Sequence, residues 1–295
     1  MLVLLASIWG ASYLFIKVAL DDLEPAPMMA IRSLAAGLIL LAYLAASYGG
    51  RRALDELRRS WRAALVLGTL NATVPFWLIA WGEKHVDSTV AGIAQSTVPI
   101  FTFLLATRFL PHEPVGTVRV AGVALGFVGV AVLAGLDPHV GWWAVAGTLA
   151  VVLSSLSYAM SGVYGQLRVR TVPGPVLATG SMLVGGLLLV PLSLFQLPDH
   201  VPDAASIASL AALTLLGTAF AQLVLFRMLR LFGSRRLSLV TYLIPGFALS
   251  YGAVFLDEPV TPAALIGLVL ILAGVALASG ERFLRSRAAA QEEPA

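Results

Sequence analysis

The sequence contains no cysteine, and only 12% of its 295 residues are charged. The lack of cysteine excludes disulfides, thiol nucleophiles and cysteine-ligated metals. Histidines could still hold a metal, but all four fall between apolar segments: His85, His112, His139 and His200. We therefore expect neither a metal centre nor a cofactor.

Long apolar segments make up most of the chain. Hydrophobic residues account for 59% of it and its mean hydropathy is +0.89, so a water-soluble fold would expose large apolar patches. Ten segments have about the 20 residues that cross a hydrocarbon core of roughly 30 Å. They lie near residues 1–20, 26–47, 61–81, 89–110, 115–135, 142–165, 174–195, 206–229, 236–256 and 261–280. The predicted fold class is an all-α membrane protein of ten transmembrane helices, with the lipid bilayer as a partner.

The residues around the first apolar segment and the distribution of Lys and Arg predict the membrane topology. The first segment has no basic leader and no small-residue cleavage site, so we expect a retained helix rather than a signal peptide. Lys and Arg concentrate in short cytoplasmic loops, and sixteen of the nineteen here fall on one side of the ten segments. Both termini should then be cytoplasmic in a multi-pass protein of the cell membrane. This orientation explains the basic excess, so no nucleic-acid partner is expected.

The basic and acidic residues assigned to the other side are few. The basic ones are Lys17, Arg32 and Lys84. The acidic ones expected to face out are Glu83, Asp87, Asp137, Asp199, Asp203, Asp257 and Glu258.

The chain also repeats itself. Glu113-Pro114-Val115 precedes one apolar segment and Glu258-Pro259-Val260 precedes another, 145 residues later. Five further pairs keep that offset: Gly122 and Gly267, Leu125 and Leu270, Gly129 and Gly274, Val130 and Val275, and Gly135 and Gly280. Because each repeat holds five helices, an odd number, the second enters the membrane from the opposite side. We predict five-helix repeats at residues 1–140 and 141–280, a short cytoplasmic tail at 281–295, and a central cavity, a plan typical of secondary transporters.

Several motifs resemble a known family. They are Trp9-Gly10-Ala11-Ser12 in the first helix, Pro27 with Arg32 in the second, Pro99 in the fourth and the two Glu-Pro-Val turns. Together they resemble the drug/metabolite transporter superfamily, in its ten-helix EamA-like branch, over essentially the whole chain. The resemblance implies a basket of helices around a central cavity and export of small metabolites, amino acids included, by alternating access. The motifs do not specify the substrate.

Polar side chains at membrane depth mark candidates for the cavity, because hydrocarbon cannot satisfy them. Trp9, Ser12 and Tyr13 share one face of the first helix. Tyr158 and Ser161 stand at the places of Trp9 and Ser12 in the second repeat. The other cavity candidates are Asn71, Gln95, Gln222, Thr241 and Tyr242. Packing or hydrogen bonding between helices is the alternative for each.

Three prolines fall inside predicted helices: Pro75, Pro99 and Pro245. A proline removes one backbone hydrogen bond and frees the carbonyl four residues earlier, which is Gln95 for Pro99 and Thr241 for Pro245. Each proline therefore marks a kink, either a hinge or a static bend.

Lys17 and Arg32 break the repeat, since Gln166 and Gly180 stand at the equivalent positions. A site for an asymmetric solute need not repeat, so we expect these cations to bind a substrate carboxylate or to form an outer gate. Their expected gate partners are Asp21, Asp22 and Glu24. Snorkelling to the headgroups is the alternative.

The sequence predicts a secondary transporter, an exporter or facilitator, of small metabolites such as amino acids or drug-like solutes. All sixteen acidic residues fall in loops or at helix ends, which argues against a midplane proton relay and favours a facilitator or coupling through hydroxyls and carbonyls. A phosphate-binding loop of the GxxxxGK[ST] type is absent, so no ATP-driven motor is expected.

Two other functions and an oligomeric state remain open. A lipid-carrier flippase of the same architecture is one alternative, with Lys17 and Arg32 supplying charge for a lipid phosphate. A membrane-embedded enzyme is less expected, and no catalytic residue is assigned, because no histidine or paired carboxylate lies at membrane depth. The stripe Gly122, Gly126 and Gly129 marks either a homodimer face or packing inside one subunit.

Overall fold

The computed structural model describes residues 1–109, 116–135, 141–237 and 239–291, and these residues contain helices and no strand. The first half contains α1 (Leu2–Ala19), α2 (Pro25–Tyr48), α3 (Gly50–Arg59), α4 (Trp61–Gly68), α5 (Val74–Glu83), α6 (Ser88–Ala94), α7 (Val98–Phe109) and α8 (Thr117–Gly135). The second half contains α9 (Trp142–Arg168), α10 (Gly174–Ser193), α11 (Ala204–Thr214), α12 (Ala221–Leu237), α13 (Val240–Phe255) and α14 (Pro262–Gln291).

Eight helical stretches of the described chain are long and apolar enough to cross a membrane. Two shorter apolar helices, Val240–Phe255 and Pro262–Ala278, complete the bundle. The ten apolar segments of the sequence coincide with these stretches, and the chain is a multi-pass membrane protein. The two shorter helices leave the count of ten spans a prediction.

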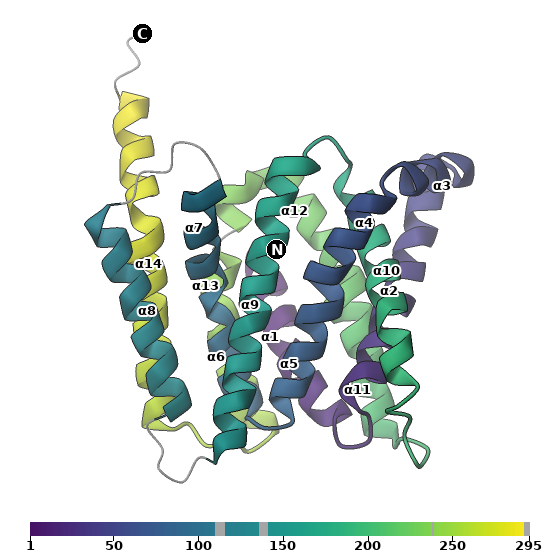
Figure 1. Cartoon of the computed structure of the whole chain (residues 1–295), viewed down its shortest axis with the longest axis horizontal. Coiled ribbons are helices and arrows are strands. Elements are labelled where there is room, and N and C mark those ends of the chain that lie inside the picture. The colour runs from purple at the N-terminus through teal and green to yellow at the C-terminus, as the bar shows by residue number, and fades with distance from the viewer. Residues whose placement is uncertain (110–115, 136–140, 238, 292–295) are drawn as a thin grey trace.

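Repeat-related helices pack against each other at both sides of the bundle. In Figure 1, α8 and α14 run side by side at the left and α2 and α10 at the right. Glycines allow the close approach of α8 and α14, because a Cβ on Gly274 would lie 2.5 Å from the carbonyl oxygen of Gly122. Apart from α3, the remaining helices lie between these two pairs.

The glycine stripe is used for this packing within the subunit. A Cβ on Gly122 would lie 2.7 Å from the Gly274 oxygen, and one on Gly129 would lie 2.9 Å from the Ile271 nitrogen, both on α14. A Cβ on Gly126 would meet the Ile100 side chain of α7. Because α14 and α7 cover the stripe, the reading of it as a homodimer face is wrong.

Figure 1 also defines two ends of the bundle. At the upper end lie α3 and the C-terminal ends of α9 and α14, which carry much of the arginine. At the lower end lie the connections after α1, α5, α10 and α13. The upper end is the one that the basic residues predict to be cytoplasmic; the cytoplasmic placement of both termini stays a prediction.

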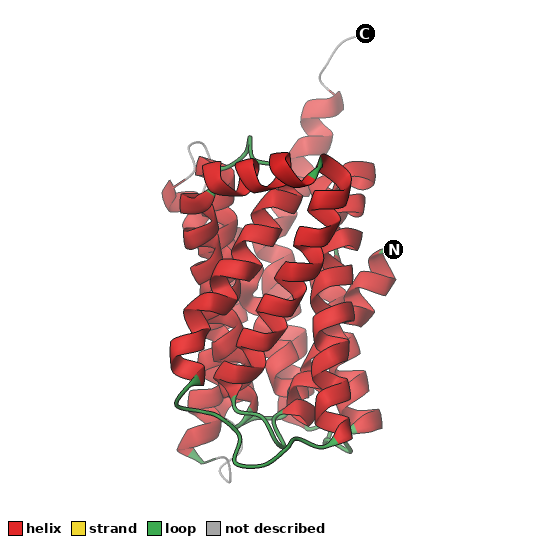
Figure 2. Cartoon of the chain, turned by 90° about the vertical axis from the view of Figure 1, so that its right-hand side faces the viewer, coloured by secondary structure: helices red, strands yellow, loops and turns green. Residues whose placement is uncertain are grey.

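Helix α3 is an element that the sequence reading assigned to a loop. It lies across the upper end of the bundle, as Figure 2 shows from the side. Ala53 is buried and Leu57 packs against the cluster around Leu44, whereas the four arginines of the helix are largely exposed. The six charged residues in this segment hid its narrow apolar face, which is typical of a helix at a membrane surface.

Three helical breaks interrupt the long spans. π-Turns η1 (Thr69–Thr73) and η3 (Leu215–Phe220) occur in equivalent spans of the two halves, and a 3-10 turn, η2 (Gln95–Thr97), separates α6 from α7. Pro75 and Pro99 are the second residues of α5 and α7, directly after breaks, whereas Pro245 lies inside the continuous α13. Such breaks free backbone groups and are frequent at functional sites.

Candidate functional site

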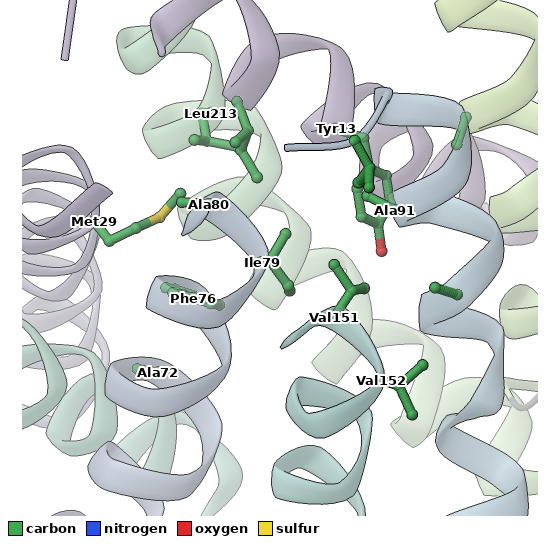
Figure 3. Packing of buried hydrophobic residues seen from close by; sticks show 14 of the residues in the cluster. Tyr13, Met29, Ala72, Phe76, Ile79, Ala80, Ala91, Val151, Val152 and Leu213 are labelled. Carbon is green, nitrogen blue, oxygen red and sulfur yellow. The ribbon is translucent and has the colours of Figure 1, made fainter. Parts of the chain in front are cut away.

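A cavity of about 410 Å³ lies among helices of both halves. It is lined by Trp9, Ser12, Tyr13, Ile16, Arg32, Asn71, Phe76, Ile79, Gly92, Gln95, Ser96, Val98, Tyr158, Met182, Gly217, Thr218, Gln222, Leu225, Thr241 and Ile244. In Figure 3, Tyr13 from α1, Ile79 from α5 and Val151 from α9 come together in the packed core beside it. The volume falls within the range of small-molecule sites, roughly 300–1,000 Å³.

The structure brings most of the predicted cavity residues together. Those that line the cavity are Trp9, Ser12, Tyr13, Asn71, Gln95, Tyr158, Gln222 and Thr241. Arg32, which was predicted for a gate or for charge recognition, lines it as well. Ser161 is buried outside the lining, and Tyr242 packs against the main hydrophobic cluster instead. Lys17 and the three prolines do not line the cavity either.

Arg32 is the charged residue of this lining, and it is 6% exposed. Its Nε donates a hydrogen bond of 2.9 Å to the Oγ1 of Thr218 on η3, in the other half of the chain. Its guanidinium carbon lies 4.0 Å from the centre of the Phe76 ring, a cation–π geometry. Nη1 contacts the sulfur of Met29 at 3.6 Å. Since a guanidinium has five N–H donors, these contacts hold Arg32 in place and leave donors for a ligand.

Gln95 is held by hydroxyls from α9. Its Oε1 accepts a hydrogen bond of 2.7 Å from Ser154, which orients the amide. Its main-chain oxygen, the carbonyl that Pro99 frees, lies 3.4 Å from the Ser155 hydroxyl and also accepts from the Val98 amide in the 3-10 turn. The predicted loosened carbonyl is therefore present but engaged.

The two π-turns bring backbone and side chains to the cavity from opposite halves. Asn71 of η1 and Gly217 and Thr218 of η3 all line it. The Thr218 hydroxyl donates to the Leu213 carbonyl five residues earlier, at 3.1 Å, and Thr73 does the same to Gly68 at 3.2 Å. Hydroxyls thus satisfy carbonyls that the wider turn leaves without a helical partner.

The expected pairing of Lys17 or Arg32 with acids after the first helix is wrong. Lys17 donates to two main-chain oxygens, those of Glu83 and Val86, each at 2.8 Å. Two of these acids have other partners: Glu24 pairs with Lys84 at 2.7 Å, and Asp22 contacts His200 and the Asp203 amide. Lys17 therefore ties α1 to the end of α5 by neutral acceptors.

Asp22 belongs to a contact between the two halves. Its Oδ1 lies 2.9 Å from Nε2 of His200, and its Oδ2 accepts from the Asp203 amide at 2.8 Å. The hydrogen bond from His200, with the one from the Asp203 amide next, lowers the pKa of Asp22 to about 2. This contact closes the lower end between α1 and α11.

Two of the acids at the lower end are buried. Glu83, the last residue of α5, is 0% exposed and Glu258 is 9% exposed. The Glu258 carboxylate accepts from the amides of Ser88 at 2.7 Å and Thr89 at 2.9 Å, at the start of α6. The second Glu-Pro-Val turn thus anchors the loop after α13 to a helix of the first half. A position at a helix end did not imply contact with water, because neighbouring loops cover it.

Some lining residues carried no sequence signal. Phe76 and Met182 are apolar residues in apolar helices, so their facing toward the cavity depends on packing. Thr218 was not among the predicted cavity residues. Its place one turn before Gln222 was the available signal that it shares the cavity face.

Comparisons with known proteins give a consistent result. The profile of the EamA-like transporter family matches residues 1–135 and again residues 145–280. The "Uncharacterized transporter YoaV" of Bacillus subtilis is 23% identical over 91% of both chains. The "Uncharacterized inner membrane transporter YedA" of Escherichia coli K12 is 26% identical over 94% of this chain and 89% of that protein. A solved structure titled only "Crystal structure of protein" shares the fold, with a TM-score of 0.66, 22% identity and coverage of 96% of this chain and 97% of that one.

Proposed function

The chain belongs to the EamA-like transporter family, and from this premise we propose that it moves small carboxylate-bearing solutes, amino acids foremost, through its central cavity by alternating access. Its relatives are named as transporters, and the chain is a membrane transporter.

The charge of the lining supports a carboxylate. Arg32 is its one residue that is charged at neutral pH, and no Asp or Glu lines the described cavity. Arginine binds carboxylates through paired N–H donors. A lipophilic cation would meet this positive charge without a counter-charge, so drug-like cations are less favoured.

The rest of the lining fits the body of an amino acid. Trp9, Tyr13, Phe76 and Tyr158 supply aromatic surface from α1, α5 and α9. Amide and hydroxyl groups supply acceptors for an ammonium group, from Asn71, Gln95, Gln222, Ser12, Ser96, Thr218 and Thr241. Aromatic and aliphatic amino acids are therefore preferred over acidic or basic ones.

Alternating access is supported by how the two halves meet. At the lower end, contacts such as Glu258 with Ser88 and Asp22 with His200 join the halves by hydrogen bonds that can be exchanged for water. The π-turns η1 and η3 supply bends beside the cavity. Rocking of one repeat against the other about a fixed central site is the usual motion of inverted repeats.

The flippase alternative has one feature in its favour. A second hollow, of about 1,040 Å³, lies among α1, α2, α10 and α12 toward the upper end, and Arg227 and Arg230 line it together with Tyr43 and Phe220. It offers two cations beside an apolar groove, as a lipid phosphate would require. The central cavity is separate from it, since their linings share no residue.

The test is uptake of labelled tryptophan, leucine, glutamate and lysine into proteoliposomes that contain the full chain. Wild type should take up tryptophan or leucine, and Arg32→Gln should reduce the initial rate about 10–100-fold, as expected for loss of a charge-assisted pair of about 1.5–3 kcal/mol. Lys84→Gln, the loss of an exposed cation on the same protein, should leave the rate unchanged.

Two results would overturn the proposal. Unchanged uptake by Arg32→Gln would remove the carboxylate site. No uptake of any of the four amino acids, together with scrambling of fluorescent phospholipid that depends on Arg227 and Arg230, would favour the flippase.

A further inference from the structure

We propose that Glu83 is a proton-binding site through which the transport cycle moves one proton. The inference rests on the proposed function, because it adds a coupling ion to that transport. It departs from the facilitator that the sequence favoured, because Glu83, although it ends a helix, is fully buried next to the cavity.

The burial of Glu83 is complete. Its exposed fraction is 0%, and neither carboxyl oxygen has a hydrogen-bond partner among the residues that the structure describes. The other buried carboxylate of the described part of the chain, Glu258, accepts two amide hydrogens. A buried polar group without a partner calls for an explanation, and a protonation site is one.

The charged groups nearest to the Glu83 carboxyl make their contacts with other groups. The groups whose charges reach it are Tyr13 and Lys17 of α1, Arg32 of α2 and Glu258 after α13. The Lys17 ammonium donates to main-chain oxygens, including that of Glu83 itself, rather than to its carboxylate. Arg32 is engaged with Thr218 and Phe76. Among the residues that the structure describes, no cation therefore contacts the Glu83 carboxyl directly, and Glu258 would repel a carboxylate there.

Burying an ionised carboxylate without such a contact is far more costly than burying the neutral acid. In the conformation of this structure, Glu83 therefore carries a proton: the carboxylate has taken one H⁺ from water to become the neutral carboxyl. When the lower end opens and water reaches the end of α5, the carboxyl can return that H⁺ to water.

The place of Glu83 joins this protonation to the cavity. Phe76, Ile79 and Glu83 follow one another on one face of α5, and the first two line the cavity. On α1, Lys17 lies one turn past Tyr13, which also lines it. Glu83 thus sits one turn beyond the cavity, where the two halves close, and closing over a solute requires the neutral carboxyl.

Direct proton binding is measured without any solute. Infrared spectra of the purified full chain in lipid, recorded in H₂O and D₂O at neutral pH, should show the carbonyl stretching band of a protonated carboxyl. Glu83→Gln, which has nearly the shape of the neutral acid, should fold and lose that band. Glu24→Gln, which removes the exposed acid paired with Lys84, should keep it.

Coupling is measured in proteoliposomes with labelled tryptophan. An imposed pH gradient should raise accumulation several-fold in wild type, whereas Glu83→Gln should exchange tryptophan across the membrane without responding to the gradient. Lack of the infrared band in wild type, its survival in Glu83→Gln, or accumulation that follows a sodium gradient instead would overturn the inference.

The two proposals fail separately. If wild type transports none of the amino acids, the proposed function is refuted. The infrared band then still tests whether Glu83 binds a proton. If wild type transports tryptophan without response to pH, the proposed function stands and the coupling falls.

Discussion

Replacing Glu258 measures how strongly the second repeat is anchored to the first at the lower end. The carboxylate accepts from the amides of Ser88 and Thr89 at 2.7 and 2.9 Å, and both of these residues are buried. Glu258→Ala removes both acceptors. A buried amide without an acceptor costs about 1–3 kcal/mol, so the two together should lower the free energy of unfolding by about 2–6 kcal/mol.

Glu258→Gln separates the two bonds. The glutamine carbonyl can accept from one amide, but its NH₂ group faces the other, so the loss should be about half, about 1–3 kcal/mol. Removing the negative charge from the start of α6 adds a part of this loss, typically about 0.3–1 kcal/mol, through the helix dipole. The order of stability should therefore be wild type, Gln, Ala.

The assay is denaturant-induced unfolding of the purified chain in detergent, followed by tryptophan fluorescence. Asp257→Asn is the matched control, because Asp257 is the neighbouring carboxylate, is exposed, and has a φ of 51° that asparagine tolerates. The control should be unchanged. Equal stability of the Ala and Gln variants, or of Ala and wild type, would refute the assignment of two separate hydrogen bonds.

Three further predictions follow from the packing and the polar contacts. Gly274→Val should lower the free energy of unfolding by at least about 1–3 kcal/mol, because its Cβ would lie 2.5 Å from the Gly122 oxygen. The control Gly162→Ala, whose Cβ would have nothing within 4 Å, should be neutral or should stabilise the protein by up to about 1 kcal/mol. Thermal melting in detergent compares the two variants. The pKa of Asp22 is lowered from 3.8 to about 2, so its carboxylate stabilises the fold at pH values above 3.8 and loses this effect as the pH falls through about 2. Asp22→Asn should therefore flatten the acid side of a plot of melting temperature against pH. A plot that is unchanged in the variant would contradict this prediction. Ser154→Ala should release the Gln95 amide and weaken tryptophan uptake several-fold with little loss of stability, while Ser250→Ala, which removes an exposed hydroxyl, should leave uptake unchanged.

Hydropathy and the repeat predicted the spans to within a few residues. The predicted segment 26–47, for example, is α2 at Pro25–Tyr48, and 61–81 is the stretch Trp61–Glu83. Hydropathy is a sum over neighbouring residues, so a run of apolar residues is readable without knowledge of the fold. The same sum concealed α3, because its arginines outweigh the apolar face formed by Ala53 and Leu57.

Polar residues at membrane depth predicted much of the cavity for a related reason. Trp9, Tyr158, Asn71 and Gln222 stand out against an apolar background, and all four line it. Phe76 does not stand out, although its ring supports Arg32. Ser161 stands out as clearly as Ser12 but lies outside the lining, because a hydroxyl can be satisfied between helices as well as in a cavity.

The sequence by itself determined the class of this protein: a membrane-spanning chain of two EamA-like repeats, with polar side chains at membrane depth and an Arg32 that breaks the repeat. Composition, periodicity and internal similarity reveal these properties. All three can be read along the sequence without knowing which segments pack together. The tertiary structure decided which charges meet. Lys17 turned out to bind carbonyls, Glu258 to cap a helix of the other repeat and Glu83 to lie without a partner, because each outcome depends on segments tens to hundreds of residues apart that only the packed bundle brings together.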